Sequence, residues 1–307
     1  MDDHKASRTA LATSLMRALH TRFDRPALLD DPWGERLVSE AEKDALLLAH
    51  LGALPAAERA AVEGLASRDA KLHAVLRVNP FYSGVVLRSR YAEEALAAAV
   101  ARGVRQYVIL GAGMDSFGVR QPPFAREVDV FEVDHPATQA LKRRRLHDCG
   151  AAIPATLHFV AADLSVERLG TALARSTFRP DRPAFFSWLG VTAYLTREAN
   201  VATLRSISDC TPAGGELVFT YLEQREFDAD RRTGALEGVR AAVASVGEPM
   251  VSGFAPEELP GLLRGLGLTL IEDLGGADIR RRYYAERTDA RAPVSTGHFA
   301  RAAREAR

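Results

Sequence analysis

A short apolar run leads directly into a glycine-containing turn at Gln106-Tyr-Val-Ile-Leu-Gly-Ala-Gly-Met-Asp-Ser116. An uninterrupted apolar run of this length is typical of a strand that is buried on both faces, as in a parallel sheet. The glycines that follow, Gly111 and Gly113, let the backbone turn tightly and approach a ligand with no Cβ in the way. The stretch therefore predicts the first strand of a sheet with a ligand-binding loop at its carboxyl end.

Similar apolar runs recur along the rest of the chain and are separated by stretches that can hold helices. The runs are Val128–Val133, Leu157–Ala162, Ala184–Leu189, Glu216–Tyr221 and Leu268–Glu272, with His298–Ala303 as a candidate last strand. The clearest intervening helices are expected at 135–148, 165–175, 196–210 and 226–246. Strands that alternate with helices are joined by right-handed crossovers, so we predict an α/β domain with a mostly parallel sheet over residues 106–307.

The residues before this domain, 1–105, are predicted to form a helical N-terminal cap. Apolar residues recur every three or four positions in three Ala- and Leu-rich stretches, Thr9–Phe23, Ser39–Leu51 and Ala56–Leu76. A fourth helix is expected over Tyr91–Arg102, because Gly103 is well suited to follow a helix end. An insertion at about 222–256 is longer than one crossover helix requires, and we expect it to form a lid.

The composition excludes several classes of protein. The 307 residues carry 40 Lys+Arg and 40 Asp+Glu, so no basic bias attracts nucleic acid or anionic lipid. Two cysteines, Cys149 and Cys210, are too few for a disulfide framework or a zinc site. The first residues lack the apolar stretch of a signal peptide, and no window approaches the ~18 apolar residues of a membrane span. We expect a cytoplasmic protein with no metal, no nucleic-acid partner and no membrane partner.

The glycine loop departs from the dinucleotide-binding pattern G-x-G-x-x-G. Ser116 occupies the place of the third glycine, and Asp115 puts a carboxylate where a pyrophosphate would lie. Both residues argue against an NAD-dependent oxidoreductase built on the same sheet. A ligand that carries an ammonium group is favoured instead, and we expect Gly111, Gly113 and Asp115 to contact it.

Two further carboxylates follow the next two strands. Asp134 comes about 20 residues after the glycine loop, a spacing that suits hydrogen bonds to ribose hydroxyls. Asp163, which is followed by Leu164, can accept a hydrogen bond from the exocyclic amine of adenine. Together with the loop, these residues indicate an adenosine ligand with a cationic tail, and S-adenosylmethionine has these features.

Several segments resemble the leucine carboxyl methyltransferase family, and most closely its actinobacterial group of S-adenosylmethionine-dependent methyltransferases. The matching segments are Arg88–Ala95, Gly103–Ser116, Phe131–Ala140, Asp163-Leu164 and Trp188–Thr196, with Arg17 and Asp31-Pro32 near the N-terminus. The resemblance implies a class I methyltransferase: a Rossmann-like, mostly parallel seven-stranded sheet with an N-terminal helical cap.

The same resemblance assigns roles to individual positions. Arg90 would hold the methionine carboxylate and Gly111 would touch the methionine portion. Asp134 would bind ribose, while Asp163 and Leu164 would flank the adenine. Many relatives carry a glutamate in the motif at 188–194 where this chain has an apolar residue, a difference that bears on how the substrate is aligned.

The acceptor is inferred from the demands of methyl transfer. A carboxylate is already ionised at pH 7, whereas a phenol with a pKa near ~10 benefits from a general base. No histidine has a compelling position: His135 precedes a proline and is expected to be structural. Tyr194, after the fourth strand, is the candidate catalytic residue that hydrogen-bonds the substrate.

The aromatic residues near the expected lid have two interpretations. They either line a pocket for an aromatic or polyketide-like substrate or belong to the packing of core and cap. The residues are Phe81, Tyr82, Phe254, Tyr283 and Tyr284.

The sequence thus predicts an S-adenosylmethionine-dependent O-methyltransferase that forms the methyl ester of a small carboxylic acid in secondary metabolism. Methylation of a hydroxyl or nitrogen of a natural product, and cofactor binding without turnover, remain open alternatives. The apolar N-terminal cap is compatible with a homodimer.

Overall fold

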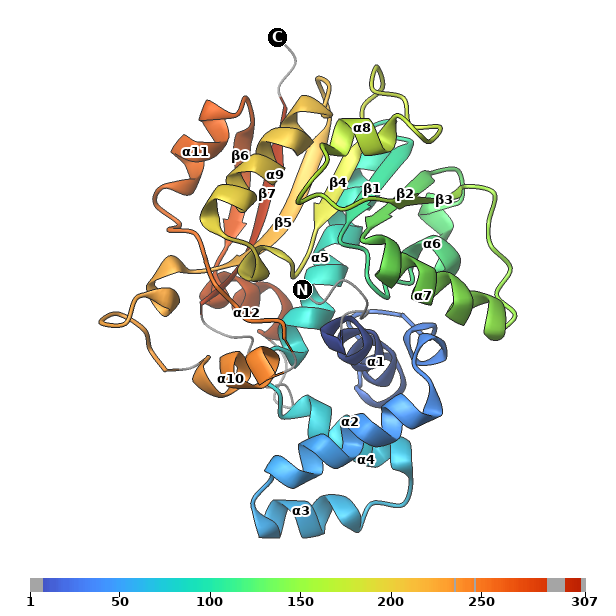
Figure 1. The fold of residues 1–307 in the computed structure, drawn as a ribbon, viewed down its shortest axis with the longest axis vertical. Helices are drawn as coiled ribbons and strands as arrows, with labels where there is room; N and C mark the ends of the chain where they lie inside the picture. Colours follow the sequence, from blue (N-terminus) through green and yellow to red (C-terminus); the bar gives the residue numbers. More distant parts are fainter. Residues whose placement is uncertain (1–7, 235, 246, 286–295, 305–307) are drawn as a thin grey trace.

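A seven-stranded sheet forms the centre of the computed structural model, which describes residues 8–234, 236–245, 247–285 and 296–304 (Figure 1). The strands are β1 (Gln106–Leu110), β2 (Asp129–Asp134), β3 (Leu157–Ala161), β4 (Phe185–Trp188), β5 (Glu216–Leu222), β6 (Thr269–Leu274) and β7 (Gly297–Ala303). Their order is β3-β2-β1-β4-β5-β7-β6. The first five strands are parallel, and β7 is antiparallel to both of its neighbours. This confirms the predicted mostly parallel sheet.

Helices cover both faces of the sheet and extend below it. They are α1 (Arg8–Phe23), α2 (Glu40–Ala53), α3 (Ala56–Glu63), α4 (Arg68–Arg77), α5 (Tyr82–Ala101), α6 (Phe117–Arg120), α7 (Pro136–Asp148), α8 (Leu169–Leu173), α9 (Arg197–Asp209), α10 (Glu237–Ser245), α11 (Leu259–Gly265) and α12 (Gly276–Tyr284). Side chains of a strand alternate between faces, so Tyr107 and Ile109 enter the core beneath α5, while Val108 and Leu110 enter the opposite core. Because a hydrophobic core covers each face of the sheet, β1 is buried along its whole length.

Several helices differ from the expected boundaries: α8 and α10 are shorter than the stretches expected at 165–175 and 226–246. The stretch expected as one helix over Ala56–Leu76 is two helices, because the chain breaks near Gly64 and restarts where Ser67 caps α4 by accepting a hydrogen bond from the amide of Ala70 at 3.1 Å. Helix α5 starts at Tyr82, well before the expected Tyr91. This earlier start places both Arg88 and Arg90 inside the helix.

Helix α5 belongs to the layers of the sheet, since it contacts β4, β5 and β7. Helices α1–α4 form the part that extends away from the sheet in Figure 1. We therefore propose that the cap ends before α5 and not at residue 105. Cap and sheet still share one hydrophobic core, which includes Leu15 of α1, Leu72 of α4 and Phe185 of β4.

The insertion after β5 carries α10. A bridge between Glu223 and Phe254 closes its base, so the segment returns to the point where it left the sheet. No residue of α10 is buried. Within the described residues, no helix combines the length and the apolar character needed to cross a membrane.

Candidate active site

The glycine loop after β1 has a backbone that requires glycine at two positions. Gly111 and Gly113 have φ angles of +62° and +50°, in the left-handed region that other residues rarely adopt. A Cβ on Gly111 would lie 2.7 Å from Cγ2 of Val191, and one on Gly113 would lie 3.1 Å from Cβ of Ala10 in α1. The loop therefore packs closely between Val191, just after β4, and Ala10 of α1, and a side chain at either glycine would not fit.

Asp134 lies at the end of β2 and faces this loop. Its carboxylate accepts hydrogen bonds from the amide of Gly113 and, at 2.6 Å, from the amide of His135. Burial raises the pKa of Asp134 above its ordinary value, and the two amide donors act in the opposite direction. Each carboxylate oxygen retains a second lone pair, so the group can still accept from the hydroxyls of a ribose.

Asp163 and Leu164 follow β3 on the same edge of the sheet. One oxygen of Asp163 accepts hydrogen bonds from the amide and the hydroxyl of Ser165, at 2.9 and 2.6 Å. These bonds lower the pKa of Asp163, which keeps it ionised. Leu164 packs against the core on that side of the sheet. A charged acceptor beside an apolar side chain suits the edge and the face of an adenine ring.

Asp115 stabilises the turn just before the short helix α6, because its carboxylate accepts a hydrogen bond from the amide of Phe117 at 2.7 Å. This contact gives Asp115 a structural role, and its electrostatic influence extends to Arg88.

A buried ion pair ties α1 to the glycine loop. Arg17 lies 2.8 Å from Asp31, and its guanidinium also donates to the carbonyl of Met114 in the loop at 2.8 Å. Ser116 donates to Asp31 at 2.6 Å. The sequence comparison singled out Arg17 and Asp31 but suggested no role for them, since nothing local to either residue shows that they meet beneath the loop.

The two arginines of α5 point in different directions. Residues two positions apart on a helix lie on nearly opposite sides, and Arg90 lies on the outer side, half exposed, with its guanidinium 2.6 Å from Glu94. Arg88 lies against Gly190, at the end of β4, where a Cβ on the glycine would collide with the guanidinium. The structure therefore brings Arg88, and not the predicted Arg90, to the site.

Arg88 is a cation without a protein partner. Within the described part of the chain, its guanidinium makes neither a hydrogen bond nor an ion pair, although it remains partly accessible. Desolvation lowers its pKa to about 10, with the positive field of Arg17 adding to the effect. A guanidinium has five N–H donors, so Arg88 is available to bind a ligand carboxylate.

Tyr194 lies close to Arg88, in a short 3-10 helix over Thr192–Tyr194. Its phenol is hydrogen-bonded with the side chain of Thr9, and burial raises its pKa, so it stays protonated. The turn is held in place because Thr192 donates to the carbonyl of Thr220 at 2.7 Å and Asn200 donates to the carbonyl of Thr192 at 2.9 Å. Tyr194 is thus a fixed hydrogen-bond donor.

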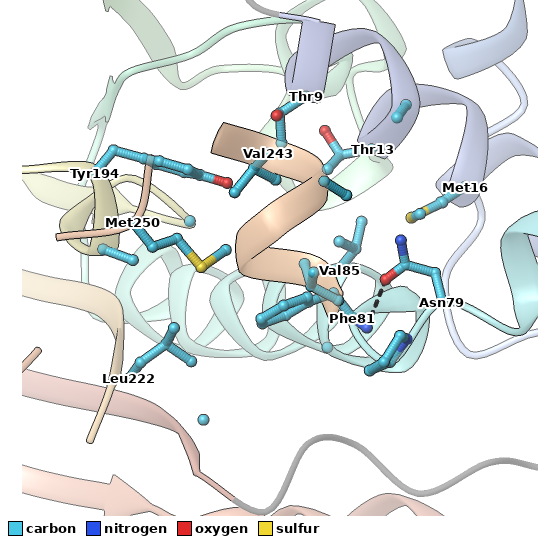
Figure 2. A pocket seen from close by; sticks show the side chains of 18 of the residues that line it. Thr9, Thr13, Met16, Asn79, Phe81, Val85, Tyr194, Leu222, Val243 and Met250 are labelled. Carbon is cyan, nitrogen blue, oxygen red and sulfur yellow. Dashed lines mark hydrogen bonds between the residues drawn. The ribbon is translucent and has the colours of Figure 1, made fainter. Parts of the chain in front are cut away.

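A cavity of about 720 Å³ extends from Arg88 and Tyr194 between the cap and the lid. Figure 2 shows the hydroxyls of Thr9 and Thr13 near the Tyr194 phenol, with Phe81 and Leu222 lining another part of the wall. Most of the lining is aliphatic and comes from α1, α2, α5, α10 and the end of β5. Pockets of 300–1,000 Å³ with few polar groups are typical of small-molecule sites.

Other titratable groups on the described cavity wall also contact the protein, although the contact of His50 involves only one ring nitrogen. Glu42 caps α2 and binds Arg145 at 2.9 Å. Nδ1 of His50 lies 2.8 Å from a carbonyl of its own helix. His298 lies 3.0 Å from Asp273, and this carboxylate, together with Glu223, raises its pKa against the effect of burial.

The aromatic residues near the lid mostly belong to the packing. Phe81 is the member of that set that lines the cavity among the described residues. Tyr82 donates to Asp24, Phe254 is buried beside the sheet, and Tyr283 donates to Glu94. His135 caps α7 by accepting from an amide at 3.3 Å, in agreement with its expected structural role.

The site fits S-adenosylmethionine on the observations above. The glycine loop exposes main chain without side chains at Gly111 and Gly113. Asp134 and Asp163 offer hydrogen-bond acceptors, and Arg88 offers a positive charge for a carboxylate. Within the described residues, no group of His, Cys, Asp and Glu is arranged to hold a metal ion.

Comparison with known proteins agrees with this geometry. The sequence model of the family described as leucine carboxyl methyltransferase matches residues 10–208. A Bacillus subtilis protein named "Putative S-adenosyl-L-methionine-dependent methyltransferase YktD" is 32% identical over 305 residues, which are 99% of this chain and 100% of that protein. A Mycolicibacterium smegmatis protein with a name of the same kind is 36% identical over 217 residues, 71% of this chain and 67% of that protein.

The fold is also found in a solved structure. The crystal structure of a DUF574 family protein from Streptomyces avermitilis is similar with a TM-score of 0.53 at 19% identity, covering 80% of this chain and 94% of that chain. Fold and site define a class I methyltransferase whose cofactor is S-adenosyl-L-methionine. The chain belongs to the leucine carboxyl methyltransferase family, as the sequence motifs predicted.

Proposed function

We propose that this methyltransferase transfers the methyl group to the carboxylate of a small organic acid and so forms a methyl ester. One observation carries the proposal: the transfer end of the cavity offers the neutral hydroxyls of Tyr194 and Thr9, while His298 on the described wall is paired with Asp273. Such a site favours an acceptor that is already negatively charged.

We propose the following roles at the cofactor. Arg88 takes the place predicted for Arg90 and binds the methionine carboxylate, because it is the arginine at the site. The main chain at Gly111 and Gly113 lies along the methionine portion. Asp134 binds the ribose hydroxyls.

The adenine end and the loop acid complete this assignment. Asp163 and Leu164 flank the adenine, as the family pattern implies. Asp115 acts mainly by shaping the loop, since its carboxylate accepts a hydrogen bond from the amide of Phe117 in the turn before α6.

When bound, S-adenosylmethionine supplies a methyl carbon whose bond to sulfur breaks as its bond to the acceptor oxygen forms, leaving S-adenosylhomocysteine. Tyr194 donates a hydrogen bond that orients the acceptor carboxylate, and its raised pKa keeps the proton on the phenol. The apolar walls exclude water, which keeps the acceptor poorly solvated and well oriented.

Methylation of a hydroxyl would place different demands on the site. His298 is the histidine on the wall nearest the strand ends, and its raised pKa favours the protonated form, which cannot act as a base. The roles in secondary metabolism, the cytoplasmic location and the homodimer remain predictions.

The proposal is tested by offering a panel of carboxylic acids, phenols and amines with S-adenosylmethionine that carries a labelled methyl group. Mild alkali releases the methyl of an ester and leaves ethers and N-methyl groups intact. We expect alkali-labile label from acids only. Alkali-stable label from phenols or amines would replace the proposal with hydroxyl or nitrogen methylation.

A further inference from the structure

The lid helix α10 is only partly covered by protein on its inner side. Its apolar residues Val239 and Val243 reach the cavity but stay only partly buried, and no residue of α10 is fully buried. The helix packs against a small cluster of four buried residues, Ala193, Leu222, Leu236 and Met250. A helix of nine residues is marginal in water without tertiary packing. Its inner side therefore needs a further apolar partner.

The opposite wall of the cavity has a complementary shape. Ala45, Ala49 and Ala53 of α2 are spaced four residues apart, so they lie in a row along one side of the helix. All three are exposed although they line the cavity. Their short side chains leave a trough that lies between α2 and α10 and continues to the Arg88 end.

The lining of this trough suits an aliphatic chain better than a ring system. The described lining includes the aromatic rings of Phe81, Tyr194, Tyr221 and Phe299, but Tyr221 and Phe299 are almost fully buried and offer little surface to a ligand. Recognition of flat rings usually relies on stacking aromatic faces. The walls instead offer alanine, valine and the flexible side chains of Met16 and Met250, which adapt to an irregular apolar partner.

We infer that the acceptor is a long-chain aliphatic carboxylic acid, with its carboxylate at Tyr194 and its chain in the trough between α2 and α10. The inference rests on the proposed carboxyl methylation and names its substrate class. The chain supplies the apolar surface that α10 lacks, so binding also orders the lid.

The first test uses straight-chain acids of roughly six to sixteen carbons, kept below their micelle concentrations and titrated calorimetrically in the presence of S-adenosylhomocysteine. Each added methylene should tighten binding by up to about fourfold until the trough is filled. Hydrogen exchange of residues 237–245 should slow with the longest acid that binds and stay fast with the shortest.

A variant in the trough gives an independent test. Ala49→Phe fills the middle of the trough and should weaken binding of the longest acid about tenfold, with the shortest acid unaffected. The matched control is Leu48→Phe, one residue along the same helix and 70% exposed, which should change neither affinity.

The outcomes separate this inference from the proposed function. Esters formed without any dependence on chain length, or tighter binding of a fused-ring acid than of a linear acid, would overturn the inference and leave carboxyl methylation intact. If binding depends on chain length and slows hydrogen exchange in α10 but no ester forms, an aliphatic chain in the trough would be supported and the proposed reaction would be overturned. Failure of all these acids to bind would overturn both.

Discussion

The cofactor side and the acceptor side of the active site differ in how completely the protein pairs and covers its own groups. On the cofactor side, Arg17 and Asp31 form a buried ion pair beneath the glycine loop, and the amide of Gly113 donates to Asp134. On the acceptor side, α10 has no buried residue and α2 presents exposed alanines to the cavity. The groups on the cofactor side are therefore mostly paired and buried without a ligand, whereas apolar side chains on the acceptor side remain uncovered.

This difference indicates how binding energy is used. A prearranged cofactor site avoids the cost of ordering groups during binding, which favours tight recognition of one invariant ligand. A partly covered acceptor cavity opens readily and lets an apolar molecule enter, at the cost of ordering α10 afterwards. The exception on the ordered side is Arg88, which lies at the boundary and lacks a partner until a carboxylate binds.

The largest expected effect comes from breaking the ordered side. Arg17→Met leaves Asp31 charged, buried and unpaired, and should lower the free energy of unfolding by about 3–5 kcal/mol in chemical denaturation. The control is Arg22→Met on the same helix, where the ion pair with Asp69 is half exposed and should contribute at most about 1 kcal/mol. Equal losses in both variants would show that the buried pair does not hold the loop.

The next largest effect concerns Arg88 and the affinity for S-adenosylhomocysteine. Arg88→Ala should weaken S-adenosylhomocysteine binding by about 10- to 100-fold in calorimetry, because charge-assisted hydrogen bonds contribute about 1.5–3 kcal/mol. Arg90→Ala, which loses only a half-exposed pair with Glu94, should stay within about twofold. The reverse ranking would restore Arg90 as the carboxylate ligand.

A smaller effect is the pH dependence of cofactor binding. Burial raises the pKa of Asp134, so protonation begins at a higher pH than for an ordinary aspartate and removes an acceptor for ribose. Affinity for S-adenosylhomocysteine should fall by up to about tenfold per pH unit below that pKa. In the unliganded protein the sign is opposite, since the folded state binds this proton more tightly and is favoured as pH falls.

Titrations at several pH values, with Asp134→Asn as the comparison, test this effect. The variant should bind more weakly at neutral pH and lose most of the dependence on acid. A slope that is unchanged in the variant would assign the dependence to another group.

The smallest expected effect lies on the acceptor side. Val243→Thr on α10 should change the free energy of unfolding by less than about 0.5 kcal/mol, because the side chain is only partly buried. The same replacement at Val75, which is fully buried in the cap, should cost about 1–3 kcal/mol for the buried hydroxyl. Similar losses at both positions would show that α10 is as firmly packed as the cap, against the contrast drawn above.

Local patterns were sufficient for much of the fold and of the cofactor site. The apolar runs predicted all seven strands within about two residues, because strands buried on both faces leave a continuous signal. Gly111, Gly113 and Asp134 were predicted as site residues because loop residues that follow parallel strands meet at one edge of the sheet, and the amide of Gly113 does donate to Asp134. The leucine carboxyl methyltransferase motifs identified the family because they lie within the matched residues 10–208. Residue 208 precedes α10, so the lid lies outside that match.

The sequence by itself determined the class of fold, the cofactor and the acids at the strand ends, because each depends on residues that are near one another in the chain. Arg88, and not Arg90, reaches the site because of the side of α5 that packs against the end of β4. The periodicity of an Ala-rich stretch does not reveal which side that is. The buried pair of Arg17 with Asp31 beneath the loop, and the trough between α2 and α10, are contacts between distant segments. Only the tertiary structure decided them, since packing sets which faces of those segments meet.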